Sequence, residues 1–292
     1  MYISSQLNSL LLLASVSTKW SEAASLRGLI VRQPKIIGGA DVDPDRYPYF
    51  ALMNGKGGLC GGVLISKRFV LTAAHCVGSA DDFEIGVTET DHDNWQMESG
   101  YEYDWKRGIM HKDWNGQKDT NDIAIFELET DSDSVPIRLE QTPITADGTE
   151  LTVIGFGDAD PKEAIDKVSD TLLETTVNYV DQNRCVDWME AGDILPDMIC
   201  AYDKGEDSCS GDSGGPLFLK GNDVSDDSLV GLVSWGYTCG GSTPGVYTRI
   251  SYFYDWVVET MCLMNPSAVP DYVNCNGIDG EIYGKEISPG DT

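Results

Sequence analysis

A serine surrounded by glycines is the first candidate nucleophile in this 292-residue chain. Ser213 lies in the segment 207–216, which reads DSCSGDSGGP and also contains two acids and a cysteine that can pin the loop. Glycine adopts backbone conformations that other residues resist, so successive N–H groups of this loop can converge on one point. A serine hydroxyl is a weak nucleophile until a base takes its proton, so a base must lie close to Ser213 in the fold.

The candidate base is found among only three histidines, His75, His92 and His111, all of which precede Ser213. The loop also fits the G-x-S-x-G elbow of α/β-hydrolases, but that arrangement needs a histidine after the serine and is therefore excluded. His75 is the best candidate because it lies in a segment of small residues, LTAAHC at 71–76, that ends in a cysteine. We expect His92 and His111 to be surface or loop residues.

The candidate acid is Asp122, in the segment 120–126 that reads TNDIAIF. A lone carboxylate that opens an apolar run is expected to point inward and to be paired. Together with IIGG at 36–39 and SWG at 234–236, the segments around His75, Asp122 and Ser213 resemble the chymotrypsin/trypsin-like serine peptidases. The resemblance covers about residues 36–262, and five motifs in this order are far more specific than any one alone.

The resemblance implies an all-β fold of two six-stranded antiparallel β-barrels, with the active site between them and a C-terminal helix. The barrels would occupy roughly residues 36–145 and 146–262. The chain itself shows short apolar runs separated by Gly, Asp, Asn and Pro, a spacing typical of antiparallel β-structure. Apolar residues on one face predict a helix at 251–261, with Ser251 as its N-cap. We expect residues 263–292 to form a C-terminal tail.

The resemblance also implies a role for each candidate residue. Ser213 would attack a carbonyl carbon, His75 would accept its proton, and Asp122 would orient the imidazole. The backbone N–H groups of Gly211 and Ser213 would bind the developing oxyanion. Asp207 would form the base of the substrate pocket and select Lys or Arg, because its charge would otherwise be buried unpaired. The other substrate-binding residues would be Ser208, Ser234, Trp235, Gly236, Gly245 and Tyr247.

The first 35 residues indicate export followed by activation. The apolar run at 10–14, within residues 1–24, is too short to span a membrane and is typical of a secretory signal peptide. Residues 25–35 have the character of an activation pro-segment. The resemblance implies that cutting after Lys35 frees the α-amino group of Ile36, which then pairs with the buried carboxylate of Asp212. We therefore expect a secreted, extracellular zymogen with no stable membrane anchor.

The chain is strongly acidic, with a formal net charge of −28. Loss of residues 1–35 would leave 16 basic and 47 acidic residues, a net charge of −31. Nucleic acid is an unsuitable partner because phosphate binding needs a basic patch. We interpret the acidity as a solvated surface, and keep attraction of basic substrates as the alternative, which salt would weaken.

Eight cysteines, an even number, suit an oxidising compartment. The chain contains neither a C-x-x-C pair nor an H-E-x-x-H motif, and the acidic stretch at 89–93 matches the family's calcium loop poorly. We therefore expect no metal and no cofactor. Three disulfides are implied by the resemblance and the fourth by elimination: Cys60–Cys76, Cys185–Cys200, Cys209–Cys239 and Cys262–Cys275.

Three functions stay open at this stage. The leading one is a secreted endopeptidase that cuts after Lys or Arg. A catalytically dead relative acting as a binding protein would need a broken triad or oxyanion loop, and neither is visible. A processing protease could have a cleft narrowed by surface loops such as 220–227. We expect a monomer whose partners are protein or peptide substrates with Lys or Arg, and protein inhibitors of proteases.

Overall fold

A computed structural model describes residues 39–43, 45–55, 58–77, 84–87, 102–157, 169 and 171–289. The chain divides into two compact units, residues 1–33 and 34–292, and every described residue belongs to the second. The predicted signal peptide and pro-segment, including Lys35 and Ile36, lie outside the described residues, as do His92 and the acidic stretch at 89–93.

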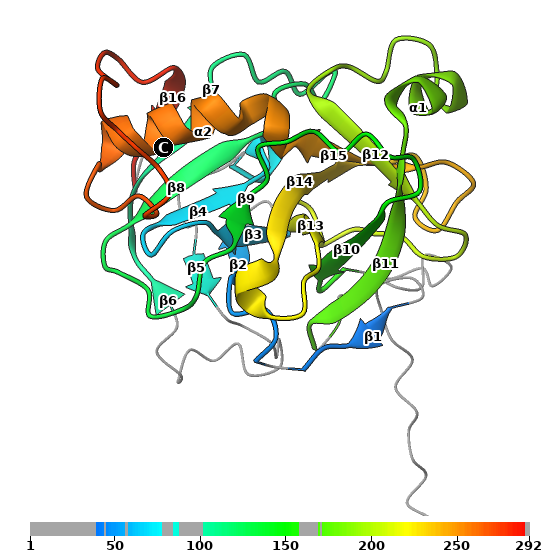
Figure 1. Ribbon diagram of the computed structural model, residues 1–292, viewed down its shortest axis with the longest axis horizontal. Helices are drawn as coiled ribbons and strands as arrows, with labels where there is room; N and C mark the ends of the chain where they lie inside the picture. The colour runs from blue at the N-terminus through cyan, green and yellow to red at the C-terminus, as the bar shows by residue number, and fades with distance from the viewer. Residues whose placement is uncertain are drawn as a thin grey trace, which may run out of the picture. The chain divides into compact units, whose positions relative to one another are not determined.

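The first sheet has eight antiparallel strands in the order β16-β7-β8-β4-β3-β2-β5-β6 (Figure 1). Seven of its strands come from the N-terminal half of the chain, and one comes from the predicted tail. The strands are β2 (Phe50–Gly55), β3 (Gly58–Leu64), β4 (Phe69–Thr72), β5 (Glu84–Val87), β6 (Glu102–Tyr103), β7 (Trp105–His111), β8 (Ala124–Leu128) and β16 (Gly284–Ile287).

The second sheet contains a closed barrel of six antiparallel strands, because β11 pairs with β12 as well as with β10. The barrel strands are β10 (Glu150–Gly155), β11 (Leu173–Val180), β12 (Met198–Tyr202), β13 (Pro216–Leu219), β14 (Ser228–Trp235) and β15 (Gly245–Arg249). Two short strands from earlier in the chain join it: β1 (Ala40–Asp41) pairs with β11, and β9 (Arg138–Leu139) with β14. The predicted all-β fold with a C-terminal helix is confirmed, and the second of the two predicted six-stranded barrels is present. The first sheet differs from the prediction: it has eight strands, and no pairing joins its end strands β16 and β6 in the described residues.

Helices are few and short in the described residues, apart from α2 (Ile250–Met264). The others are η1 (Ala74–Val77), α1 (Gln182–Trp188) and η4 (Val224–Asp226). The helix predicted at 251–261 exists, but Ser251 is not its N-cap: the helix begins at Ile250 after Arg249, which makes no side-chain capping bond. Within the described part of the chain, no helix is both long and apolar enough to cross a membrane.

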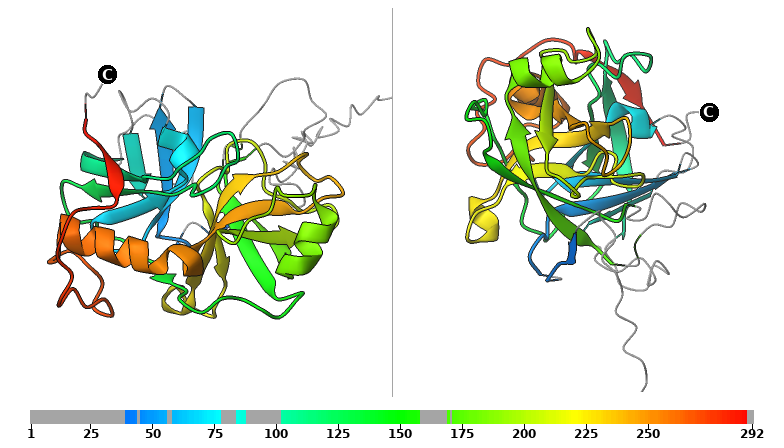
Figure 2. Two further views of the ribbon diagram at one scale, coloured as in Figure 1. Left: turned by 90° about the horizontal axis from the view of Figure 1, so that it is seen from above. Right: turned by 90° about the vertical axis from the view of Figure 1, so that its right-hand side faces the viewer.

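The C-terminal tail is attached to both the first sheet and α2. Its strand β16 extends the first sheet beside β7, as Figure 2 shows in red. The Trp256 indole N–H of α2 donates to the carbonyl oxygen of Tyr283 at 2.8 Å. The disulfide between Cys262 and Cys275 ties the tail to the end of the helix.

His111, at the end of β7, is buried, so its prediction as a surface or loop residue was wrong. Its ring lies against those of Phe253, Trp256 and Tyr283, with ring centroids 5.1–5.6 Å apart. Burial lowers the pKa of His111 and outweighs the opposing charges of Asp113 and Asp197. These aromatic side chains come from α2 and the tail, which are far from His111 in the sequence, so the residues around His111 do not predict its burial.

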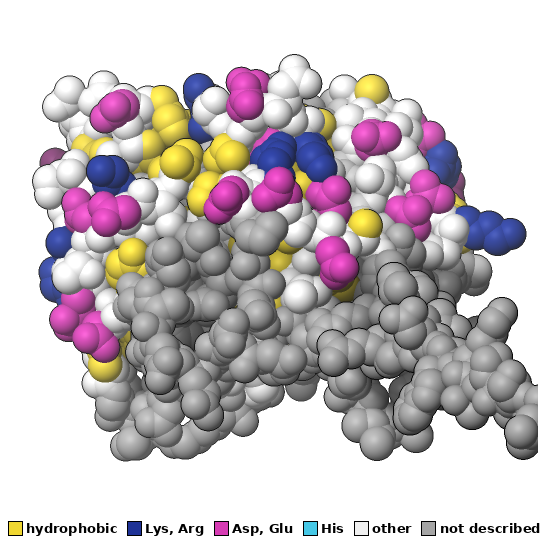
Figure 3. All heavy atoms as spheres, turned by 90° about the horizontal axis from the view of Figure 1, so that it is seen from below, with side chains coloured by type: hydrophobic (Ala, Val, Ile, Leu, Met, Phe, Trp, Pro, Cys, Tyr) yellow, Lys and Arg dark blue, Asp and Glu magenta, His cyan; other side chains and the backbone are white. Residues whose placement is uncertain are grey.

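Apolar side chains fill the barrel and the space beneath α2. On β11, buried residues alternate with partly exposed ones, which places every second side chain inside the barrel. Phe253, Val257 and Met261 of α2 pack into the larger core of the first sheet. On the described part of the face in Figure 3, acidic and basic side chains are interspersed rather than gathered into one patch.

Candidate active site

His75 and Asp122 are brought together by strand pairing. Thr72 at the end of β4 pairs with Ala124 at the start of β8, so the residues just beyond the two strands are neighbours. The Asp122 carboxylate, only 2% exposed, accepts the His75 backbone N–H through Oδ1 at 2.9 Å. Its Oδ2 lies 2.7 Å from His75 Nδ1. The carboxylate therefore fixes both the backbone and the ring of the histidine.

The Asp122 segment is also held from the second sheet. Ser234 at the end of β14 donates its hydroxyl to Asp122 Oδ2 at 2.5 Å. Thr248 of β15 donates its hydroxyl to the Asp122 carbonyl oxygen at 2.6 Å. Asn121, in the left-handed region at φ 54°, donates its backbone N–H to Asp197 Oδ2 at 2.7 Å. The roles of Thr248 and Asp197 were missed, because no local pattern links them to a residue over 70 positions earlier.

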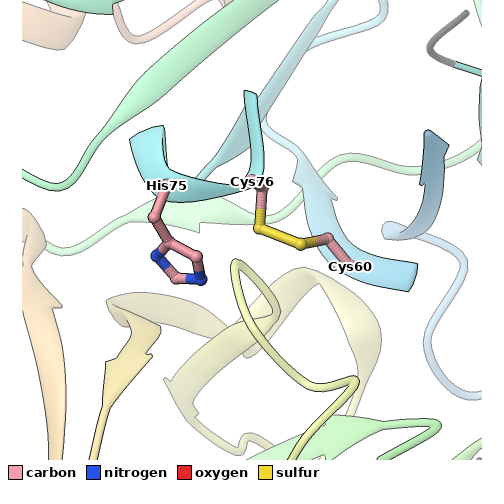
Figure 4. A group of neighbouring side chains, drawn as sticks. All are labelled: Cys60, His75 and Cys76. Carbon is pink, nitrogen blue, oxygen red and sulfur yellow. A yellow bond between two sulfur atoms is a disulfide. The ribbon is translucent and has the colours of Figure 1, made fainter. Parts of the chain in front are cut away.

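The electrostatic environment raises the pKa of His75. Burial alone would lower it, but the hydrogen bond and charge of Asp122, together with the charge of Asp119, outweigh the burial. Figure 4 shows His75 beside the disulfide between Cys60 and Cys76. Although these three residues lie close enough to hold a metal ion, the two sulfurs are bonded to each other, so neither is a free thiolate ligand.

The loop that carries Ser213 packs tightly against the first sheet. The Ser213 carbonyl oxygen accepts the Gly61 backbone N–H at 2.7 Å and lies 3.5 Å from Cys76 Sγ. Gly214 has φ 78°, and a Cβ there would lie 2.2 Å from Thr72 Oγ1. Only glycine permits this approach. The approach places Ser213 next to Cys76, the neighbour of His75 in η1.

The loop contains the two predicted oxyanion donors, the backbone N–H groups of Gly211 and Ser213. Gly211 has φ 100°, which a residue with a side chain rarely adopts. Among the residues that the structure describes, none accepts a hydrogen bond from the N–H of Gly211 or of Ser213. The disulfide between Cys209 and Cys239 fixes the start of the loop. Within the described part of the chain, these two N–H groups therefore make no hydrogen bond that would compete with an anion.

Asp212 is fully buried beneath the same loop. Its carboxylate accepts the backbone N–H of Gly157 at 2.7 Å and that of Cys209 at 2.8 Å. A Cβ at Gly155 or Gly157 would lie 2.0–2.2 Å from this carboxylate, so glycine is needed at both positions. Burial raises the pKa of Asp212 to about 7, against these two N–H groups. No cationic side chain among the described residues bonds to it.

A pocket of about 180 Å³ opens beside Ser213. Its walls come from residues 207–210, 213, 233–236, 238–239 and 245. Asp207 contributes a carboxylate whose Oδ2 accepts the Gly240 backbone N–H at 2.9 Å. Burial raises the pKa of Asp207 to about 6, and the N–H groups of Gly240 and Ser208 oppose this. A partly desolvated carboxylate, which no described cationic side chain pairs with, thus lies in a pocket next to the candidate nucleophile.

The two predicted wall glycines keep this pocket open. A Cβ at Gly236 would meet nothing closer than the Gly245 Cα, at 4.0 Å. A Cβ at Gly245 would lie 3.2 Å from Asp207 Oδ1. Tyr247, in contrast, does not line the pocket: it is fully buried in the barrel behind the wall, and its hydroxyl lies 3.3 Å from Ser208 Oγ.

All four predicted cysteine pairs are present as disulfides: Cys60–Cys76, Cys185–Cys200, Cys209–Cys239 and Cys262–Cys275. Residues 220–227 are not among those that line the pocket beside Ser213. Instead, Asp227 is buried and accepts hydrogen bonds from Arg46 and Tyr49. Asp227 thereby anchors this loop to Arg46 and Tyr49.

Comparison with known proteins gives one consistent family. The Trypsin family model matches residues 36–257. The chain is 35% identical to "Trypsin epsilon" of Drosophila erecta over 237 residues, covering 77% of this chain and 87% of that protein. It is 36% identical to "Trypsin 5G1" of Aedes aegypti, covering 77% and 84%. It is also 36% identical to "Mast cell protease 3" of Ovis aries, covering 78% and 89%. The chain therefore belongs to the trypsin family and is a serine endopeptidase.

Proposed function

We propose that this endopeptidase is secreted as a zymogen and hydrolyses peptide bonds after Lys or Arg with Ser213, His75 and Asp122. The observation that carries the proposal is that Asp207 and Ser213 line one pocket of about 180 Å³. A Lys or Arg side chain in this pocket would give the carboxylate a cation and place the following carbonyl carbon beside the serine.

In the proposed reaction, Ser213 Oγ attacks the carbonyl carbon while His75 accepts its proton at Nε2. Asp122 keeps His75 Nδ1 protonated, as their 2.7 Å contact favours, and stabilises the imidazolium. The backbone N–H groups of Gly211 and Ser213 bind the oxyanion. His75 then gives the proton to the leaving amine, and a water molecule, deprotonated by His75, releases the acyl group and restores Ser213.

Activation would act through Asp212. Cutting after Lys35 would create an α-amino group on Ile36, and this cation would pair with the buried carboxylate. The raised pKa of Asp212 supports this step, because the intact chain leaves the carboxylate without a cation among the described residues. An ordered Asp212 would fix the neighbouring loop. Export is supported by the four disulfides and by the apolar run at 10–14.

The test is cleavage of matched peptide amides that end in Arg, Lys, Phe or Ala, before and after the Lys35–Ile36 bond is cut. To cut that bond alone, residues 31–35 are replaced by the recognition sequence of a protease with unrelated specificity. We expect cleavage only after Arg and Lys, and only once Ile36 is the N-terminus. Equal cleavage after Phe or Ala would refute the role of Asp207, and equal activity of the intact chain would refute the zymogen.

A further inference from the structure

A second pocket, of about 420 Å³, adjoins the first. It lies between residues 117–119, the segment 192–195 and residues 235–237. The two pockets share Trp235 and Gly236 as wall residues. An extended chain rises about 3.3 Å per residue, so a substrate that fills the first pocket presents its nearest neighbours to the second.

Two carboxylates line this second pocket. Asp119 is partly buried and in the left-handed region at φ 50°, which aspartate tolerates better than most residues. No described residue gives its carboxylate a hydrogen bond. Burial raises the pKa of Asp119, with a further contribution from the charge of Asp122, while the charge of His75 opposes both. Asp193 accepts a hydrogen bond from the Tyr237 hydroxyl, which leaves its second oxygen for another donor.

Among the described residues, the only cationic side chain that lines this pocket is that of Lys118, which is exposed. Lys118 forms no ion pair with either carboxylate. The pocket therefore presents two carboxylates and one solvated ammonium group to a substrate. A negatively charged side chain would be repelled here, and a positively charged one would gain a carboxylate partner.

We infer that the second pocket binds a second basic side chain of the substrate, so that the enzyme prefers sites where the Lys or Arg at the cut has another Lys or Arg within about four residues. The inference rests on the proposed cleavage after Lys or Arg. Asp119 and Asp193 act as specificity-determining residues, and the substrate class is polypeptides with clustered basic residues. These two carboxylates would then be a place where the acidity of the chain affects substrate binding.

The experiment uses the full chain activated at Lys35–Ile36 and a set of peptides with one Arg at the cut. Each position within four residues on either side is varied among Lys, Gln and Glu, and kcat/KM is measured at low and high salt. The quantity compared is the ratio of kcat/KM for Lys to that for Gln at one position. This ratio cancels any general loss of activity in a variant. Asp119→Asn and Asp193→Asn are compared with the exposed Asp133→Asn, which removes the same charge outside the pocket.

We expect one position at which Lys exceeds Gln by about threefold to tenfold, with Glu below Gln, since a partly exposed ion pair contributes about 1 kcal/mol. Asp119→Asn or Asp193→Asn should reduce this ratio, high salt should weaken it, and Asp133→Asn should leave it unchanged. Cleavage after Arg with no preference at any position would overturn the inference alone. Absence of cleavage after Arg would overturn the proposed function and the inference together.

Discussion

The buried carboxylate of Asp212 should make the stability of the intact chain depend on pH in a way that activation removes. A pKa raised from 3.8 in the unfolded chain to about 7 in the folded one corresponds to about 4 kcal/mol of destabilisation once both states are ionised. The folded state holds its proton over the range in which the unfolded state has lost it. Stability contributed by Asp212 is therefore greatest below pH 4 and falls as the pH rises towards and past about 7.

Between pH 5 and pH 8 this group alone should lower the free energy of unfolding of the intact chain by about 3 kcal/mol. The α-amino group of Ile36, once freed, would stabilise the ionised carboxylate and remove most of that loss. The assay is urea unfolding at both pH values, in a Ser213→Ala background that prevents self-digestion. Intact and cut chains are compared, each with and without Asp212→Asn.

For each chain, the change in the free energy of unfolding between the two pH values is compared with that of its Asp212→Asn variant. This comparison removes the contribution of other groups that titrate in this range, such as Asp207, because they are present in all four proteins. We expect the intact chain to lose about 3 kcal/mol more than its Asp212→Asn variant between the two pH values. The cut chain should lose less than the intact one. If intact and cut chains show the same dependence on pH, the pairing of Ile36 with Asp212 is refuted.

Three further predictions concern the cleft and the tail. Gly236→Val should reduce kcat/KM for Arg peptides about tenfold or more, because the new side chain enters the pocket. The Tm should stay unchanged, because the nearest atom to the new Cβ is the Gly245 Cα at 4.0 Å. A lower Tm would mean instead that the side chain strains the fold. Asp119→Asn should move the acidic limb of the kcat/KM profile to lower pH, because the charge of Asp119 raises the pKa of His75 and activity needs its neutral ring; an unmoved limb would contradict this coupling. Replacing both Cys262 and Cys275 with Ser opens a loop with a sequence separation of 13 and should lower the free energy of unfolding by about 3 kcal/mol, with the Arg-to-Phe cleavage ratio unchanged; a changed ratio would link the tail to the cleft.

Much of the site could be predicted because its residues lie in short motifs with local constraints. Gly214 is needed where a Cβ would collide with Thr72, and Asp122 opens the apolar run that becomes β8. The wall glycines and Asp207 also meet at one pocket, as expected. Constraints of this kind determine the residue type at one position, so a family resemblance can assign them residue by residue.

The parts that could not be predicted depend on contacts between distant segments. Thr248 and Asp197 hold the Asp122 segment across more than 70 residues, and nothing next to them in the sequence indicates it. The tail was not predicted to contain a strand because β16 has only four residues. What holds β16 in the sheet is its pairing with β7, which lies far away in the sequence. His111 was misplaced for the same reason, since its aromatic neighbours come from α2 and the tail.

The proposed reaction requires that His75 activates Ser213 as a nucleophile. The most direct test is labelling with an organophosphonate fluoride, which phosphonylates activated serines, followed by mass spectrometry of the digested protein. We predict a single adduct on Ser213 in the cut chain, and its loss in His75→Ala. An adduct on another serine, or labelling of Ser213 that His75→Ala leaves unchanged, would contradict the claim.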